Sequence, residues 1–156
     1  LSMGHSVHRI LGGGYWKDRP GDTVAVIGAG PTGLCTMACA RLYTPASILA
    51  IDTDPYRLDL AKKKGLADVT LIPGEGDLPE KVRDLTKGRG ADVVLEVAGG
   101  EDTFQTAWQI ARPNAVVVVV AMYEEPQTLP LPDMYGKNLT FRTGAWTAVT
   151  GRRSWI

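Results

Sequence analysis

The strongest constraint on the fold is a glycine pattern, Gly28-Ala29-Gly30-Pro31-Thr32-Gly33, that lies between two regular segments. Residues 23–27 (TVAVI) form a continuous apolar, β-rich run, which predicts a buried strand. In the segment that follows, apolar residues recur at helical spacing from Leu34 to Leu42. The glycines therefore predict a tight turn that joins a strand to a helix.

A G-x-G-x-x-G spacing between a strand and a helix is the pattern of a dinucleotide phosphate loop. Gly28 permits the tight turn, Gly30 lets the backbone approach a pyrophosphate, and Gly33 lets the helix pack against the strand. Pro31 loses no hydrogen bond at the first helical position, and free amides around Thr32 face the phosphates. We expect these five residues to bind a dinucleotide. The alternative is a glycine-rich turn with no ligand.

The rest of the chain alternates apolar runs with helix-like segments, which predicts a parallel sheet with helices on both faces. Helices are expected over residues 56–64 after Pro55, over 78–87, and over 102–112, where Arg-Pro-Asn is a stop signal. Three prolines make 124–133 an expected extended connection rather than a helix. The predicted fold is α/β, a Rossmann-type doubly wound parallel six-stranded sheet in a single domain. Its expected strands are 23–27, 47–51, 68–72, 92–97, 115–121 and 139–143.

Composition excludes several classes of protein. The 156 residues are 44% apolar and 22% charged, with 17 basic and 17 acidic side chains, the balance of a soluble globular protein. That balance favours neither nucleic acid nor a membrane as partner, and the longest apolar run, 115–122, is too short to span a bilayer. We therefore expect a cytoplasmic protein.

Asp52 follows the second expected strand, about 20 residues after Gly33. A carboxylate at this position can accept hydrogen bonds from both hydroxyls of an adenosine ribose. It favours NAD over NADP, because Asp52 and nearby Asp54 would repel a 2′-phosphate, although Arg57 could soften the repulsion. Two alternatives stay open: Asp52 as the N-cap of the next helix, and Arg57 as a solvated helix residue.

No metal-binding or catalytic constellation is recognisable. His5 and His8 have no carboxylate or thiol nearby in sequence, and the spacing of Cys35 and Cys39 is that of neither a disulfide framework nor a zinc knuckle. No nucleophile is paired with a base, and no G-x-S-x-G is present. We assign no catalytic residue and no metal ligand.

Four segments together closely resemble the coenzyme domain of zinc-dependent medium-chain alcohol dehydrogenases: PGDTVAVIGAGPTGL, ILAIDTDPYRLDLAKKKG, GADVVLEVAGG and KNLTFRTG. The nearest branch is the bacterial NAD-dependent alcohol and formaldehyde dehydrogenases. The resemblance implies an NAD-binding Rossmann domain over residues 20–144. It leaves an irregular N-terminal segment, 1–19, and a C-terminal tail, 145–156, that do not match the family.

The resemblance also implies particular coenzyme contacts. Asp52 and Arg57 would contact the adenosine ribose, and Val97 and Ala98 would line the adenine side of the cleft. Beside the nicotinamide would lie Val120, Ala121 and Met122.

The last strand carries two further implications of the resemblance. Thr143 and Gly144 would lie close to the nicotinamide. In such enzymes the edge of this strand pairs with a second subunit, so residues 139–143 are the expected site of a homodimer.

The family's N-terminal, barrel-like domain supplies the Cys, His and acidic ligands of a catalytic zinc, and nothing of it is found in this sequence. Without zinc, no Lewis acid polarises the alcohol oxygen and lowers its pKa. The resemblance thus implies zinc in the full-length family but not in this chain. We expect NAD to bind and the chain to be inactive alone.

The two end segments resemble the family in other reading frames. With suitable codons, residues 7–19 read one base later give STGYWAADIGKID, which resembles the segment before PGDTV in these enzymes. Residues 145–156 read one base earlier can give GVDGGHWPEVLD, close to the helix after the last strand. We hypothesise a frameshifted or mis-assigned frame of a longer gene, which resequencing would test.

Three function classes remain. The first is an NAD-dependent alcohol dehydrogenase of which this chain is the coenzyme half. The second is a stand-alone NAD(H)-binding or sensing module without catalysis. The third is an FAD-binding domain, since VAVIGAGPTGL also suits a flavoprotein, but Asp52 replaces the usual Glu, and LEVAGG and VVVVVAMY disfavour it.

Overall fold

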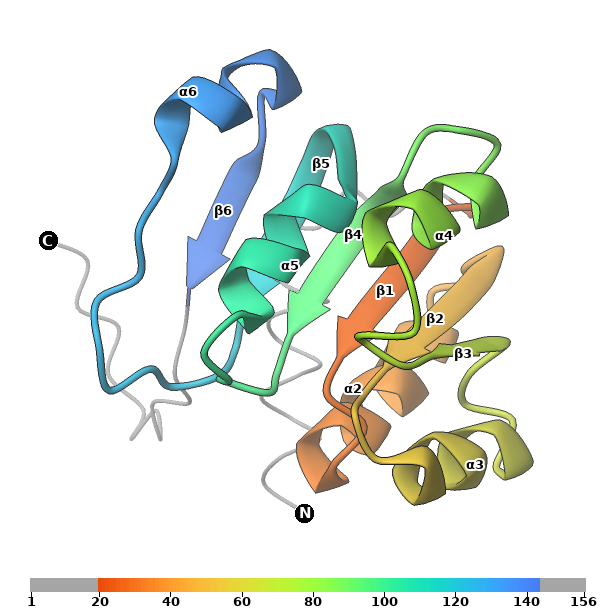
Figure 1. The fold of residues 1–156 in the computed structure, drawn as a ribbon. Coiled ribbons are helices and arrows are strands. Elements are labelled where there is room, and N and C mark those ends of the chain that lie inside the picture. Colours follow the sequence, from red (N-terminus) through yellow and green to blue (C-terminus); the bar gives the residue numbers. More distant parts are fainter. Residues whose placement is uncertain (1–19, 144–156) are drawn as a thin grey trace, which may run out of the picture.

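The computed structural model describes residues 20–143, which form one parallel sheet with helices on both faces (Figure 1). The hydrogen-bonded strand order is β3-β2-β1-β4-β5-β6. The predicted α/β, doubly wound six-stranded sheet is thereby confirmed. Its strands are β1 (Thr23–Ile27), β2 (Ser47–Ile51), β3 (Val69–Leu71), β4 (Ala91–Glu96), β5 (Ala111–Val119) and β6 (Thr140–Thr143).

Helices connect the strands and cover the sheet in two layers. The helices α2 and α3 pack on one face, and α4 and α5 pack on the other. A short helix and a 3-10 turn precede the last strand. The helical elements are α2 (Pro31–Arg41), α3 (Pro55–Lys63), α4 (Leu78–Leu85), α5 (Thr103–Ile110), α6 (Leu131–Met134) and η1 (Tyr135–Lys137).

The central strand β1 shows why these segments are apolar without interruption. Val24 and Val26 pack in the cluster beneath α2 and α3, whereas Ala25 and Ile27 pack in the cluster beneath α4 and α5. Every residue of β1 is buried. Since alternate side chains meet opposite helical layers, both strand faces must be apolar.

The strand order creates a switch point beside β1. After β1 the chain proceeds to β2 and β3 on one side, and then crosses to β4 on the other side of β1. In open parallel sheets, ligands bind at such a point, beyond the carboxyl ends of the strands. The loops after β1, β2 and β4 therefore define where a site is expected.

The boundary between the fourth long helix and the fifth strand differs from the sequence prediction. A helix is predicted to residue 112, but α5 ends at Ile110 and β5 begins at Ala111, whose backbone is extended. The register of β4 with β5 shifts between Ala91 and Val93, where Arg112 forms an ion pair with Asp92. An irregular strand start thus accommodates the Arg-Pro-Asn sequence that also ends the helix.

The prediction of a wholly extended connection over 124–133 is wrong at its end, because α6 begins at Leu131. The first turn of a helix does not use its amide hydrogens in helical hydrogen bonds. Pro132, which has no amide hydrogen, is therefore compatible with this turn. Met134 packs with Phe104 and Trp108 of α5, and this contact holds the turn against the domain.

Residues 1–19 and 144–156, including both end segments, lie outside the described residues. Residues 20–143 contain no helix with the length and hydropathy of a membrane span.

Candidate functional site

A cleft of about 390 Å³ opens at the switch point, and we call it the switch-point cleft. The structure brings together there most of the residues that the sequence analysis selected: Gly28, Gly30, Pro31, Thr32, Gly33, Asp52, Arg57, Val97 and Ala98. The sequence analysis did not select six other residues that line the cleft: Ile27, Ile51, Thr53, Pro73, Gly100 and Thr103. Most of them lie at or just after the end of a strand, and this position could have been recognised from the sequence.

The three glycines of the turn have different surroundings. Gly28 has φ +103°, a conformation that favours glycine, and lies against Val97 and Ala98 of the loop after β4. A Cβ on Gly33 would lie 1.9 Å from the Gly28 carbonyl oxygen, so Gly33 is required for helix packing. A Cβ on Gly30 would meet only the Arg57 guanidinium, at 3.9 Å. The space above Gly30 is therefore open to a ligand.

The N-terminus of α2 has no side-chain cap. Asp54 caps α3 by accepting from the Tyr56 amide, and Asp77 caps α4 by accepting from the Glu80 amide. In α2 the N-cap is Gly30, no side chain accepts its amides, and no acidic residue lies in its first turn. The partial positive charge of this helix end is consequently available to an anion in the cleft.

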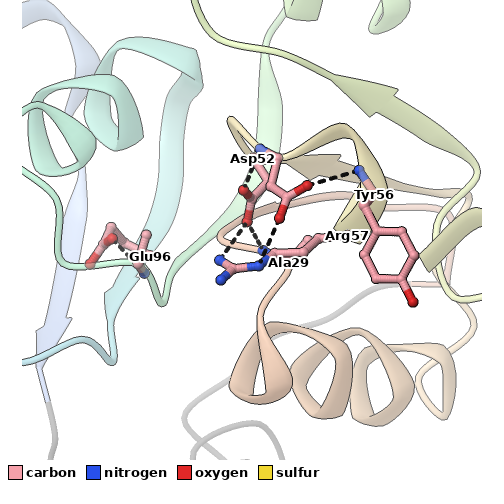
Figure 2. A network of polar contacts seen from close by, with 7 residues as sticks. Ala29, Asp52, Tyr56, Arg57 and Glu96 are labelled. Atoms are coloured by element: carbon pink, nitrogen blue, oxygen red, sulfur yellow. Dashed lines mark hydrogen bonds and ion pairs between the residues drawn. The ribbon is translucent and has the colours of Figure 1, made fainter. Parts of the chain in front are cut away.

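The Asp52 carboxylate joins the loop after β2 to the glycine turn, as Figure 2 shows. It accepts from the Ala29 amide at 2.6 Å and from the Asp54 amide at 2.8 Å, and its side chain is 8% exposed. Because the cap of α3 is Asp54, the alternative of Asp52 as that N-cap is wrong. The arrangement holds a carboxylate in place at the rim of the glycine turn.

Arg57 extends from α3 over the glycine turn. Its Nε lies 3.4 Å from Asp54, and its Nη1 lies 3.9 Å from Asp52. The side chain is half exposed, so these ion pairs contribute little to stability. The structure thus places Arg57 within the cleft rather than as a purely solvated helix residue.

Val120, Ala121 and Met122, also predicted to contact coenzyme, do not line the switch-point cleft. They follow β5, and the amides of Val120 and Ala121 donate to the carbonyl of Glu96. Met122 is 85% exposed. This loop therefore lies beside the loop after β4, outside the cleft itself.

Among the described residues, no three His, Cys, Asp or Glu side chains are placed to hold a metal ion. Cys35 and Cys39 of α2 form no disulfide. Burial, and to a smaller extent the proximity of Cys35, raises the pKa of Cys39. His5 and His8 lie outside the described residues. The residues present in this part of the chain do not fit a zinc site.

The arrangement of strands and helices recurs in known proteins. The family model for zinc-binding dehydrogenases matches residues 31–155. The chain belongs to the zinc-binding dehydrogenase family. As a member of this family, it matches the coenzyme-binding part, in agreement with the resemblance noted from its sequence.

Individual alcohol dehydrogenases are similar over most of the chain. An alcohol dehydrogenase of Cupriavidus necator is 41% identical over 113 residues, which is 72% of this chain and 31% of that protein. The alcohol dehydrogenase TADH from Thermus sp. ATN1 superposes with a TM-score of 0.79 at 36% identity, covering 92% of this chain and 40% of that one. A short chain alcohol dehydrogenase from E. coli CFT073, complexed with cofactor NADH, has a TM-score of 0.79 at 25% identity. This match covers 91% of this chain and 41% of that one. The chain thus spans less than half the length of these relatives.

Proposed function

We propose that the switch-point cleft binds NAD(H), as the coenzyme-holding part of a zinc-dependent alcohol dehydrogenase-like oxidoreductase. The observation that carries the proposal is the uncapped N-terminus of α2 beside an open Gly30. Bound NAD supplies a hydride acceptor, and the residues of this chain bind and orient it. The pyrophosphate is held by the amides of the first turn of α2, through backbone contacts that Gly30 permits.

Asp52 sets the preference between the two nicotinamide coenzymes in this proposal. The amides of Ala29 and Asp54 fix the carboxylate, which leaves its remaining lone pairs for the ribose hydroxyls. A 2′-phosphate would meet the same carboxylate and be repelled. Arg57, which contacts both acids, adds a positive charge at the adenosine end.

The Asp52→Asn variant tests this role. We expect its preference for NADH over NADPH to fall roughly tenfold, because the charge that repels a 2′-phosphate is removed and one of the two amides that donate to Asp52 loses its acceptor. Binding is followed by nucleotide fluorescence on titration. The matched control is Asp59→Asn, which changes an exposed acid of α3 that pairs with Lys63. An unchanged preference in Asp52→Asn, or an equal change in the control, would remove Asp52 from the site.

In the proposed function, the described residues bind the coenzyme and supply no catalytic group. The described residues offer no metal site, and no pair of side chains in the cleft is arranged as nucleophile and base. We predict that this 156-residue chain, supplied with NAD, zinc and primary or secondary alcohols, forms no NADH above background. Absorbance at the NADH band measures the rate, with an intact family member as positive control. Turnover by the chain would contradict this prediction.

We also propose a homodimer through the edge of the sheet at residues 139–143. Within the described residues, β6 pairs only with β5, so one strand edge faces outward. An apolar hollow beside it includes Leu131, Tyr135 and Phe141; Leu131 is 65% and Tyr135 91% exposed. A second copy would cover both the strand edge and the apolar surface.

The Tyr135→Glu variant tests the dimer, since it places a charge on the apolar surface without disturbing the core. Sedimentation velocity is expected to show a dimer for the unaltered chain and a monomer for the variant. Tyr56→Glu, at an exposed position on α3, is the control and should stay dimeric. A monomeric unaltered chain would contradict the proposal.

A further inference from the structure

Glu96, the last residue of β4, is fully buried although it is an acid. Its Oε1 accepts from the Ala98 amide at 2.9 Å and from the Gly99 amide at 2.8 Å. Its Oε2 is buried with no partner at hydrogen-bond distance among the described residues, although the Tyr123 hydroxyl interacts with the carboxylate. A buried, half-satisfied carboxylate costs free energy, so packing alone does not explain its presence.

The main chain of the same residue holds a second loop. The Glu96 carbonyl accepts from the Val120 amide at 2.8 Å and from the Ala121 amide at 3.2 Å. The two loops also touch directly, because a Cβ on Gly99 would lie 3.1 Å from the Met122 carbonyl oxygen. One residue therefore holds both the loop 97–100, which lines the switch-point cleft, and the loop 120–122 beside it.

Two hydroxyl groups extend this cluster. Thr103 donates to the Gly100 carbonyl at 2.8 Å, and the Tyr123 hydroxyl lies within hydrogen-bond distance of Thr103 Oγ1, at 2.8 Å. Burial and the nearby Glu96 carboxylate together raise the pKa of Tyr123 to about 12, against an opposing contribution from the hydrogen bond with Thr103. Tyr123 thus stays protonated and keeps its bond to the start of α5.

We propose that Glu96 is a positioning residue for coenzyme binding, whose carboxylate and carbonyl together hold the loops 97–100 and 120–122 for the dinucleotide. The inference rests on the proposed NAD(H) site and deepens it. Glu96 itself does not line the cleft, and Figure 2 shows it apart from the cluster around Asp52. Its influence on binding passes through the backbone of the two loops.

Two substitutions separate the length of the side chain from its charge. Glu96→Gln keeps the length and an oxygen that can accept from the Ala98 and Gly99 amides, so NADH affinity should stay within about threefold. Glu96→Asp keeps the charge but is one methylene shorter and cannot reach both amides. Losing one or both of these hydrogen bonds should weaken NADH binding by about tenfold or more.

Asp92→Asn is the matched control, because Asp92 is a buried acid near the start of the same strand. It accepts from the Thr23 amide at 2.8 Å and pairs with Arg112, far from either loop. This variant should lower the melting temperature and leave NADH affinity within about twofold. Amide hydrogen exchange provides a second readout: the Ala98 and Gly99 amides should exchange faster in Glu96→Asp only.

The outcomes separate this inference from the function on which it rests. If the unaltered chain binds no NADH, the proposed function fails and the role of Glu96 fails with it. If the unaltered chain binds NADH and Glu96→Asp binds equally well, only the role of Glu96 is overturned. A loss in Glu96→Gln or Asp92→Asn as large as that in Glu96→Asp would also overturn it.

Discussion

Gly33→Ala is expected to lower the free energy of unfolding by about 3 kcal/mol or more. The added Cβ would lie 1.9 Å from the Gly28 carbonyl oxygen and 2.7 Å from its carbonyl carbon. Both atoms belong to the backbone of the glycine turn, so no side-chain rotation relieves the contact. Either α2 must move off β1 or the turn must change its path, and urea denaturation followed by circular dichroism measures the cost.

Gly30→Ala is the control for this prediction, since it adds the same methyl group three residues earlier. Its Cβ meets only the flexible end of Arg57, at 3.9 Å, and its φ of −68° suits any residue. Alanine is a poorer N-cap than glycine, so we expect a loss of less than about 1 kcal/mol. Equal destabilisation by the two variants would contradict the prediction, because it would show that the protein accommodates the Cβ at Gly33 without a large loss in the free energy of unfolding.

Gly30→Val is expected to reduce NADH affinity about a hundredfold or more, the equivalent of about 2.7 kcal/mol. The branched side chain would fill the open space above the turn and keep the pyrophosphate away from the amides of α2. Titration of the variant with NADH, followed by fluorescence, measures the loss. Its unfolding transition should stay close to that of Gly30→Ala.

Comparison with Gly30→Ala makes the binding experiment specific. A single methyl group leaves more of the space open, so Gly30→Ala should lose less affinity than Gly30→Val. A Gly30→Val protein that is folded and binds NADH normally would exclude the glycine turn as the phosphate site. A graded loss with side-chain size would support it.

Local patterns were sufficient to predict the glycine turn and most of the elements. The turn lies between TVAVI and an apolar helix face, and the structure has β1 and α2 at these positions. Such features depend on residues close in sequence, whose periodicity and backbone preferences are visible without a partner. The boundary at Ala111 and the turn of α6 were predicted less well, because packing against β4 and α5 decides them.

The role of Glu96 illustrates what local patterns could not provide. In the sequence it is one acid at the end of an apolar run, within the predicted strand 92–97. Its carbonyl meets Val120 and Ala121 only because β5 pairs beside β4. Hydrogen bonds between segments depend on which strands are neighbours, and an acid at the end of a strand does not by itself indicate which loops it will contact.

The sequence by itself determined the fold class, the family and the glycine turn, because each depends on short motifs with their own conformational preferences. Tertiary structure alone decided how the turn is completed. It brought Asp52 onto the Ala29 amide and extended Arg57 over Gly30. The physical reason is that the parallel sheet places the carboxyl ends of β1, β2 and β4 together, and side chains distant in sequence then share one cleft.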